Sequence, residues 1–104
     1  MFIIYGSNNC PDCINCKANF DKYHIRYKFV EVLDSLSNLK KFLYYRDNNK
    51  DVFNRLIEVG DIGLPAIVDE NDKVFTDWET YLKENGFEPF YVSKEFCSRN
   101  NKNC

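Results

Sequence analysis

Short apolar runs alternate with segments of helical spacing along most of the chain. Residues 2–5 form a continuous apolar run, which the polar residues 6–9 bring to an end. A run of this kind is typical of a strand that is buried on both faces and followed by a loop. The apolar-rich residues 27–33 predict a second strand. Two further short runs, at 66–68 and 73–75, are separated by a polar turn and predict a hairpin.

Helical spacing of apolar residues begins directly after the first predicted strand. Pro11 suits the first position of a helix, because its missing N–H has no helical partner there. The helix is expected to extend to about Tyr23. Its core-facing stripe has 3-4-3 spacing and consists of Cys13, Cys16, Phe20 and Tyr23.

Helical spacing returns between the second and third predicted strands. Asp34 or Ser35 can cap the next helix. The apolar positions of that helix are Leu36, Leu39, Phe42 and Leu43. Residues 48–49, both asparagine, break the helix, and residues 52–57 suggest a further helical stretch that ends near Gly60.

A last short helix follows the hairpin. Thr76 is its predicted cap, because Glu79 three residues later completes a capping-box pattern, and residues 85–86 end the helix. The predicted order is β-α-β-α-β-β-α, one parallel crossover unit followed by a hairpin and a helix. Residues 1–86 make one domain. Residues 87–104 form a C-terminal extension whose aromatic first half is expected to pack on that domain.

Composition and charge narrow the class of protein. The 104-residue chain has 44% hydrophobic and 16% aromatic residues, which favours a folded globule, and its formal net charge is −2. The interspersed charges lack the basic face that nucleic-acid binding requires. No apolar run approaches the about 20 residues of a membrane span, and no secretory signal pattern follows Met1. We therefore expect a cytoplasmic monomer that binds neither nucleic acid nor membrane.

Three of the five cysteines lie close together, at Cys10, Cys13 and Cys16. Structural disulfides are rare in the cytoplasm, so this cluster indicates a role in redox chemistry or metal binding. Cys10-Pro11-Asp12-Cys13 lies where a strand ends and a helix begins, which is typical of redox pairs. The unpaired N–H groups and the dipole of the helix start favour a Cys10 thiolate. Asp12 opposes this with a like charge, whose effect is small if its carboxylate is solvated.

Cys10 and Cys13 are the two cysteines expected to form a disulfide. Residues three apart within a regular helix have Cβ atoms about 5–6 Å apart, whereas a disulfide requires about 3.5–4.5 Å. Cys13 and Cys16 both lie inside the predicted helix, while Cys10 at its cap can move towards Cys13. Cys16 shares the stripe of Phe20 and is expected in the core.

An alternative interpretation of the cluster is a metal centre. Cys10, Cys13 and Cys16 would then belong to an iron–sulfur or zinc binding module. The fourth ligand would be an external thiol or one of three residues, Cys97, Cys104 or His24.

A second motif completes a family resemblance. Residues 63–65, Gly-Leu-Pro, stand directly before a predicted strand, and together with the CxxC they resemble the thioredoxin superfamily. Residues 10–13 with Lys17 match the glutaredoxin pattern CPxCxxxK. The chain is similar to bacterial glutaredoxin-related proteins from Met1 to about Gly86. The resemblance implies an α/β, thioredoxin-like fold, in which a four-stranded mixed β-sheet is flanked by α-helices.

The resemblance also implies roles for individual residues. Cys10 would be the nucleophile and Cys13 the resolving cysteine. A cis peptide bond would precede Pro65, and Leu64 would offer its backbone to the substrate. Substrate contacts are implied for Pro11, Lys17, Leu64, Pro65, Thr76 and Asp77. From the residues alone, a solvated Lys17 and helix caps at Thr76 and Asp77 remain the competing interpretation.

The implied activity is thiol–disulfide oxidoreduction, in which a Cys10–Cys13 dithiol reduces protein or glutathione mixed disulfides. The substrate would be a disulfide-containing protein or a low-molecular-weight thiol, with glutathione as co-substrate and with no bound cofactor or metal. Residues 7–9 lack the lysine, and residues 75–79 the Gly-Gly pair, of many glutathione-using members. The reductant is therefore left open between glutathione and a thioredoxin-reductase-type flavoprotein.

Overall fold

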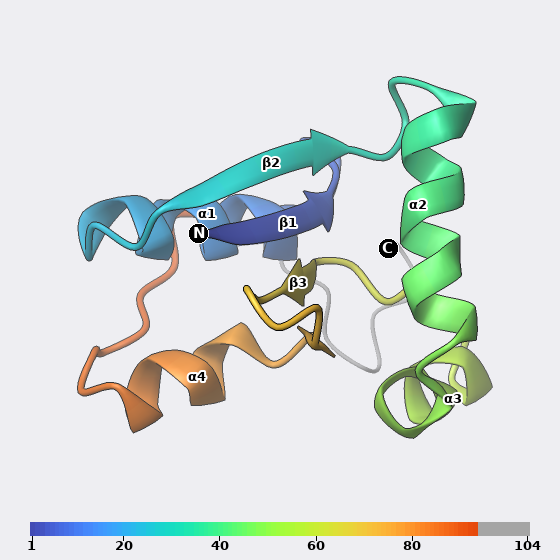
Figure 1. The fold of residues 1–104 in the computed structure, drawn as a ribbon. Helices are drawn as coiled ribbons and strands as arrows, with labels where there is room; N and C mark the ends of the chain where they lie inside the picture. The colour runs from blue at the N-terminus through green and yellow to red at the C-terminus, as the bar shows by residue number, and fades with distance from the viewer. Residues whose placement is uncertain (94–104) are drawn as a thin grey trace.

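The computed structural model describes residues 1–93, which form one four-stranded sheet flanked by helices (Figure 1). The elements in chain order are β1 (Phe2–Gly6), α1 (Pro11–Lys22), β2 (Tyr27–Glu31), α2 (Leu36–Asp47), α3 (Lys50–Glu58), β3 (Ala66–Val68), β4 (Val74–Phe75) and α4 (Trp78–Glu84). Within this part of the chain, no helix is long and apolar enough to cross a membrane.

β1 is an interior strand of the sheet, whose strand order is β2-β1-β3-β4. It pairs in parallel with β2, where Phe2 is opposite Tyr27, and antiparallel with β3, where Tyr5 is opposite Ala66. β4 pairs antiparallel with β3 at the edge. The parallel strands β1 and β2 are joined through the helix α1, because a parallel pair requires a long crossover connection. The antiparallel strands β3 and β4 are joined by a tight turn, which antiparallel pairing allows. The predicted mixed sheet flanked by helices is confirmed.

Successive residues of β1 face two different cores, because side chains alternate between the faces of a strand. Ile4 faces α1 and α4. This α1/α4 core contains Ile4, Cys16, Phe20, Ile67, Trp78 and Leu82. Tyr5 faces α2 and α3 on the other side. This α2/α3 core contains Tyr5, Val32, Phe42, Phe53, Ala66, Val68 and Val74. In Figure 1, α2 and α3 stand together at the right, away from α1 and α4.

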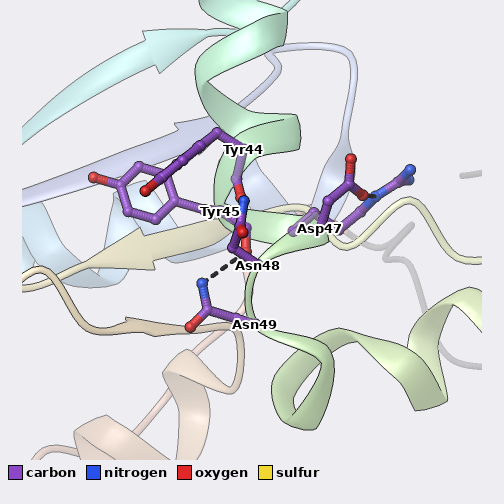
Figure 2. Close-up of polar contacts among 6 residues, drawn as sticks. Tyr44, Tyr45, Asp47, Asn48 and Asn49 are labelled. Atoms are coloured by element: carbon purple, nitrogen blue, oxygen red, sulfur yellow. Dashed lines mark hydrogen bonds and ion pairs between the residues drawn. The ribbon is translucent and has the colours of Figure 1, made fainter.

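The connection between β2 and β3 contains two helices. The further helical stretch predicted at residues 52–57 is confirmed as α3, which the predicted element order did not count as a separate helix. The side chains of residues 48–49 fold back on the last turn of α2 (Figure 2). Asn48 Nδ2 donates to the carbonyl of Tyr44 at 2.8 Å. Asn49 Nδ2 donates to the carbonyl of Tyr45 at 2.7 Å. The carbonyl of Tyr44 also accepts the backbone N–H of Asn48 at 3.1 Å. The two asparagine side chains thus bond carbonyls of the last turn, where a helix runs out of backbone donors, which is consistent with the end of α2 at the asparagine pair.

The helix caps differ in part from prediction. Of the two candidates ahead of α2, Ser35 is the cap, and its Oγ accepts a hydrogen bond from Asn38 N at 3.1 Å. The predicted cap of α4 is wrong, because Asp77 rather than Thr76 is the N-cap. Asp77 accepts the N–H of Thr80 at 3.1 Å and its hydroxyl at 2.8 Å. A carboxylate accepts both bonds, so Asp77 caps better than the threonine hydroxyl.

The second strand ends earlier than the predicted residue 33. β2 stops at Glu31, whose carboxylate accepts the N–H of Leu33 at 3.1 Å and so starts a turn. Val32 enters the α2/α3 core, but Leu33 is 64% exposed. Leu36, predicted on the core stripe, is 76% exposed, because it is the first residue of α2 and precedes the turns that face the core.

Residues 87–93, which we term the C-terminal segment, run along α1. The buried side chain of Asn19 bonds both backbone groups of Phe90, donating to its carbonyl at 2.7 Å and accepting its N–H at 3.0 Å. Near the end of α1, the rings of Tyr23 and Phe87 stack with centroids 4.6 Å apart. The segment is thus held by a polar pair and an aromatic pair.

A second buried asparagine holds the end of the C-terminal segment. Asn15 Oδ1 accepts the N–H groups of Val92 and Ser93, each at 2.9 Å. Because Asn15 lies closer to the start of α1 than the first contact points do, the segment runs antiparallel to the helix. Cys97 and Cys104 of the predicted extension lie outside the described residues.

Asn19→Ala is expected to lower the free energy of unfolding by about 2–3 kcal/mol, because the substitution leaves both backbone groups of Phe90 without their partner. Denaturant titration measures the change. Asn54→Ala, at an exposed position of α3, is the matched control and should change stability by less than about 0.5 kcal/mol. Equal effects of the two substitutions would contradict this role of Asn19.

Candidate functional site

Cys10 and Cys13 meet at the start of α1. Cys10 is the N-cap and has extended backbone angles, with φ −103° and ψ 114°, and Pro11 opens the helix. The Sγ atom of Cys10 accepts a hydrogen bond from the backbone N–H of Cys13 at 3.4 Å. The predicted placement is confirmed, with the first cysteine outside helical geometry and the second inside it.

The two thiols have different environments. Cys10 is partly exposed, whereas Cys13 is fully buried. The hydrogen bond from the Cys13 thiol lowers the pKa of Cys10, against the opposing effects of burial and of the Asp12 charge. The same hydrogen bond, together with burial, raises the pKa of Cys13 far above its usual range. The site therefore favours a Cys10 thiolate that accepts a hydrogen bond from a neutral Cys13.

The end of β1 packs directly on Cys13. A Cβ atom added to Gly6 would lie 2.8 Å from Cys13 Sγ and 3.1 Å from Cε1 of Phe29. The first distance is shorter than real Cβ contacts, so only glycine lets the strand end approach the helix this closely. This contact fixes Cys13 against the sheet.

The residues before β3 lie at the same end of the sheet. Ala66 is opposite Tyr5, and one further step of this antiparallel register places Pro65 opposite Gly6. The Leu64–Pro65 peptide bond is cis, as the resemblance implied. Pro65 is buried and Leu64 is half-buried. The sheet register thus brings this segment to the same end of β1 as Gly6, the residue that packs on Cys13.

Lys17 is engaged with the loop that precedes α1. Its Nζ donates to Asn8 Oδ1 and lies 3.9 Å from the centroid of the Phe29 ring. The carboxylate of Glu31 accepts the N–H of Asn8 at 2.8 Å and the hydroxyl of Ser7 at 3.2 Å, so β2 also holds this loop. A substrate contact would require Lys17 to exchange Asn8 for a group of the substrate.

Thr76 and Asp77 stand at the start of α4, which Trp78 joins to the start of α1. Trp78 is 1% exposed, and its Nε1 donates to Asp12 Oδ1 at 3.3 Å. Asp77 is exposed, while Thr76 is partly buried and accepts the backbone N–H of Trp78 at 2.9 Å. Their contact with a substrate stays a prediction.

The small effect predicted for the Asp12 charge depends on a solvated carboxylate, and Asp12 is instead partly buried. Burial raises the pKa of Asp12 to about 6, an effect that the charges of Glu79, Asp61 and Asp77 increase and the Trp78 hydrogen bond reduces. Sequence reasoning missed this contact. The signal that points to it is the tryptophan itself, because a buried indole N–H requires an acceptor.

Cys16 lies in the α1/α4 core beside Phe20, in agreement with the predicted stripe, and is fully buried. Burial raises its pKa well above the usual range, so the side chain is a neutral thiol. Over residues 1–93, no group of three or more histidine, cysteine, aspartate and glutamate side chains is placed to hold a metal ion.

Comparison with known proteins identifies a bacterial relative. An uncharacterized protein of Haemophilus influenzae is 33% identical over 75 residues, which cover 72% of this chain and 86% of that protein. The chain belongs to the family of this protein. No family model and no solved structure matches the chain.

In this member of the family, the predicted site residues fall into three groups. Cys10 and Cys13 are in direct contact, and Leu64-Pro65 reaches them through the sheet register. The start of α4 reaches them only through Asp12. The site therefore combines an ionisable thiol, a buried second thiol and an acidic flank.

Asp12→Asn is expected to raise the free energy of unfolding at pH 7 by about 1–2 kcal/mol. Asparagine still accepts the Trp78 hydrogen bond, and the gain is no larger because the carboxyl is only partly buried. The folded-state pKa of about 6 lies above the ordinary value of 3.8, so ionisation of Asp12 opposes folding. The gain should shrink as the pH falls from about 6 to about 4, where Asp12 becomes protonated in both states. Denaturant titration across this range measures it. An equal gain in stability at pH 4 and pH 7 would contradict a raised pKa of Asp12 in the folded protein.

Gly6→Ala is expected to destabilise the protein by about 1–3 kcal/mol, because the new methyl group overlaps Cys13 Sγ. Thermal or denaturant unfolding measures the loss. The double variant Gly6→Ala/Cys13→Ala removes the sulfur and should recover part of it. If the loss is fully additive with that of Cys13→Ala, the contact is not its cause.

Proposed function

We propose that the protein is a thiol–disulfide oxidoreductase with a thioredoxin-like fold and glutaredoxin-like activity. The observation that carries this proposal is the asymmetry of the pair at the start of α1. Cys10 caps the helix, is partly exposed and has a lowered pKa, while Cys13 is buried and has a raised pKa. A nucleophile and a protected second thiol are the two parts that disulfide exchange requires.

In the first step, the Cys10 thiolate attacks one sulfur of the substrate disulfide. A bond forms between Cys10 Sγ and that sulfur, the substrate S–S bond breaks, and the other substrate sulfur leaves as a thiolate that takes a proton from solvent. The product is a mixed disulfide between Cys10 and the substrate. Loss of the Cys10 negative charge removes the acceptor that favours a neutral Cys13.

In the second step, Cys13 loses its proton and attacks Cys10 Sγ. The mixed disulfide breaks, the second substrate thiol is released, and a Cys10–Cys13 disulfide remains. The substrate has gained two electrons and two protons. A reductant, either glutathione or a thioredoxin-reductase-type flavoprotein, returns the two cysteines to the dithiol state.

The segment before β3 supports docking of the substrate beside Cys10. Leu64 is half-buried and directly precedes Pro65 and β3. In this proposal the backbone of Leu64 pairs with an extended segment of the substrate. Further candidate contacts are Pro11, which opens α1, Lys17, which bonds the loop ahead of α1, and Asp77, whose charge acts on Asp12, together with its neighbour Thr76. The substrate is then a disulfide-containing protein or a low-molecular-weight thiol in mixed disulfide form. A cytoplasmic location suits a dithiol that must be reduced again.

Cysteine substitutions test the proposal. Cys10→Ser is expected to abolish reduction of a small mixed disulfide. Cys13→Ser should accumulate a covalent adduct at Cys10, because the resolving thiol is absent, and mass spectrometry detects this adduct. Cys16→Ala is the control and should retain most of the turnover, since Cys16 lies in the α1/α4 core. Turnover by Cys10→Ser, or its loss in Cys16→Ala alone with the fold intact, would overturn these roles.

A further inference from the structure

Asp12 occupies the residue between Pro11 and Cys13, in the first turn of α1. Its carboxylate does not extend freely into water. Oδ1 accepts the indole N–H of Trp78 at 3.3 Å, and Trp78 is itself fixed in the α1/α4 core with 1% of its surface exposed. A rigid buried donor therefore holds a carboxylate at the start of the helix that Cys10 caps.

The surroundings of Asp12 are rich in negative charge. Glu79 and the cap Asp77 belong to the start of α4, and Asp61 comes from the loop before β3. The thiols of Cys10 and Cys16 face it from α1, and the Tyr91 hydroxyl, which donates to Glu79, faces it from the C-terminal segment. The charges of Glu79, Asp77 and Asp61 each favour the neutral form of Asp12.

The charge of Asp12 acts on Cys10. It raises the pKa of the Cys10 thiol, in opposition to the hydrogen bonds from the backbone and from Cys13. A destabilised thiolate makes the reduced pair less stable relative to its disulfide, and stabilisation of the thiolate has the opposite effect. The position of the carboxylate therefore bears on the redox equilibrium of the pair as well as on the rate of attack.

We propose that Asp12, held by Trp78, is a positioning residue that opposes the Cys10 thiolate and thereby makes the Cys10–Cys13 pair a stronger reductant. This inference rests on the proposed function. It adds a device that tunes the pair and is built from one residue inside the CxxC motif and one residue from α4. Below about pH 6, protonation of Asp12 removes the opposing charge, so the tuning applies at neutral and higher pH.

The test is redox equilibration of the full chain in glutathione buffers at pH 7.5, with the dithiol quantified by alkylation and mass spectrometry. Asp12→Asn should shift the equilibrium about threefold towards the dithiol, which corresponds to about 14 mV. Thiolate absorbance should show a lower Cys10 pKa in the same variant. At pH 5 the difference in equilibrium should be lost.

Asp51→Asn is the matched control, because Asp51 is an exposed acid in the first turn of α3 and its loss changes the net charge equally. It should leave the equilibrium unchanged. In a Trp78→Phe background, Asp12→Asn should have a smaller effect, because the carboxylate is no longer held in place.

The outcomes separate the two proposals. If the wild-type chain forms no reversible Cys10–Cys13 disulfide, the proposed function fails. If it forms one, but Asp12→Asn leaves the equilibrium unchanged or shifts it no more than Asp51→Asn does, the inference about Asp12 is overturned while the function stands.

Discussion

Burial of β1 on both faces is the constraint on which the rest of the structure depends. An interior strand with apolar residues at every position requires a layer of helices on each side of the sheet. Ile4 and Tyr5 accordingly enter different cores, one built with α1 and α4 and the other with α2 and α3. The strand also pairs with both β2 and β3, so its register positions the chain segments that meet at its carboxyl end. The site lies at that end.

Three segments converge there for separate physical reasons. The start of α1 supplies backbone N–H groups, the glycine that ends β1 allows close approach to Cys13, and the register of β3 places Leu64-Pro65 alongside. The resulting contrast between a partly exposed Cys10 and a buried Cys13 arises from position rather than from residue type. The charge of Asp12, in the first turn of α1, opposes the Cys10 thiolate that the hydrogen bonds of the helix start favour. The acidic residues of α4 act on Asp12 rather than on the cysteines.

α1 makes two sets of tertiary contacts and also carries the cysteine pair at its start. Its apolar stripe, with Cys16 and Phe20, faces the α1/α4 core. Asn15 and Asn19 present buried amide groups to the C-terminal segment, whose backbone would otherwise be left without partners. The chain beyond α4 is therefore attached to the same helix that carries the cysteines, as Figure 1 shows for the segment that passes from α4 to α1. This attachment gives hydrogen-bond partners to both amide groups of buried Asn19 and to Oδ1 of buried Asn15.

Sequence by itself determined the features that depend on local pattern. The strands, the helix start at Pro11, the break at the asparagine pair and the placement of Cys10 at the cap follow from burial period, turn chemistry and capping, which act over a few residues. It failed where two local signals compete, as at Thr76 and Asp77, where a carboxylate with two acceptors displaces a hydroxyl as the cap. It also failed at Leu36, whose apolar character says nothing about its place at the exposed first turn.

Only the tertiary structure decided which distant residues meet. The contact of Trp78 with Asp12, the position of Pro65 opposite Gly6 and the binding of the C-terminal segment by Asn15 and Asn19 join residues that no periodicity links. Each depends on how the sheet register and the helix layers bring separate segments together. The motif therefore determined the pKa values of the cysteine pair only in part, because burial also acts on both thiols and the residues of α4 act on Asp12 between them.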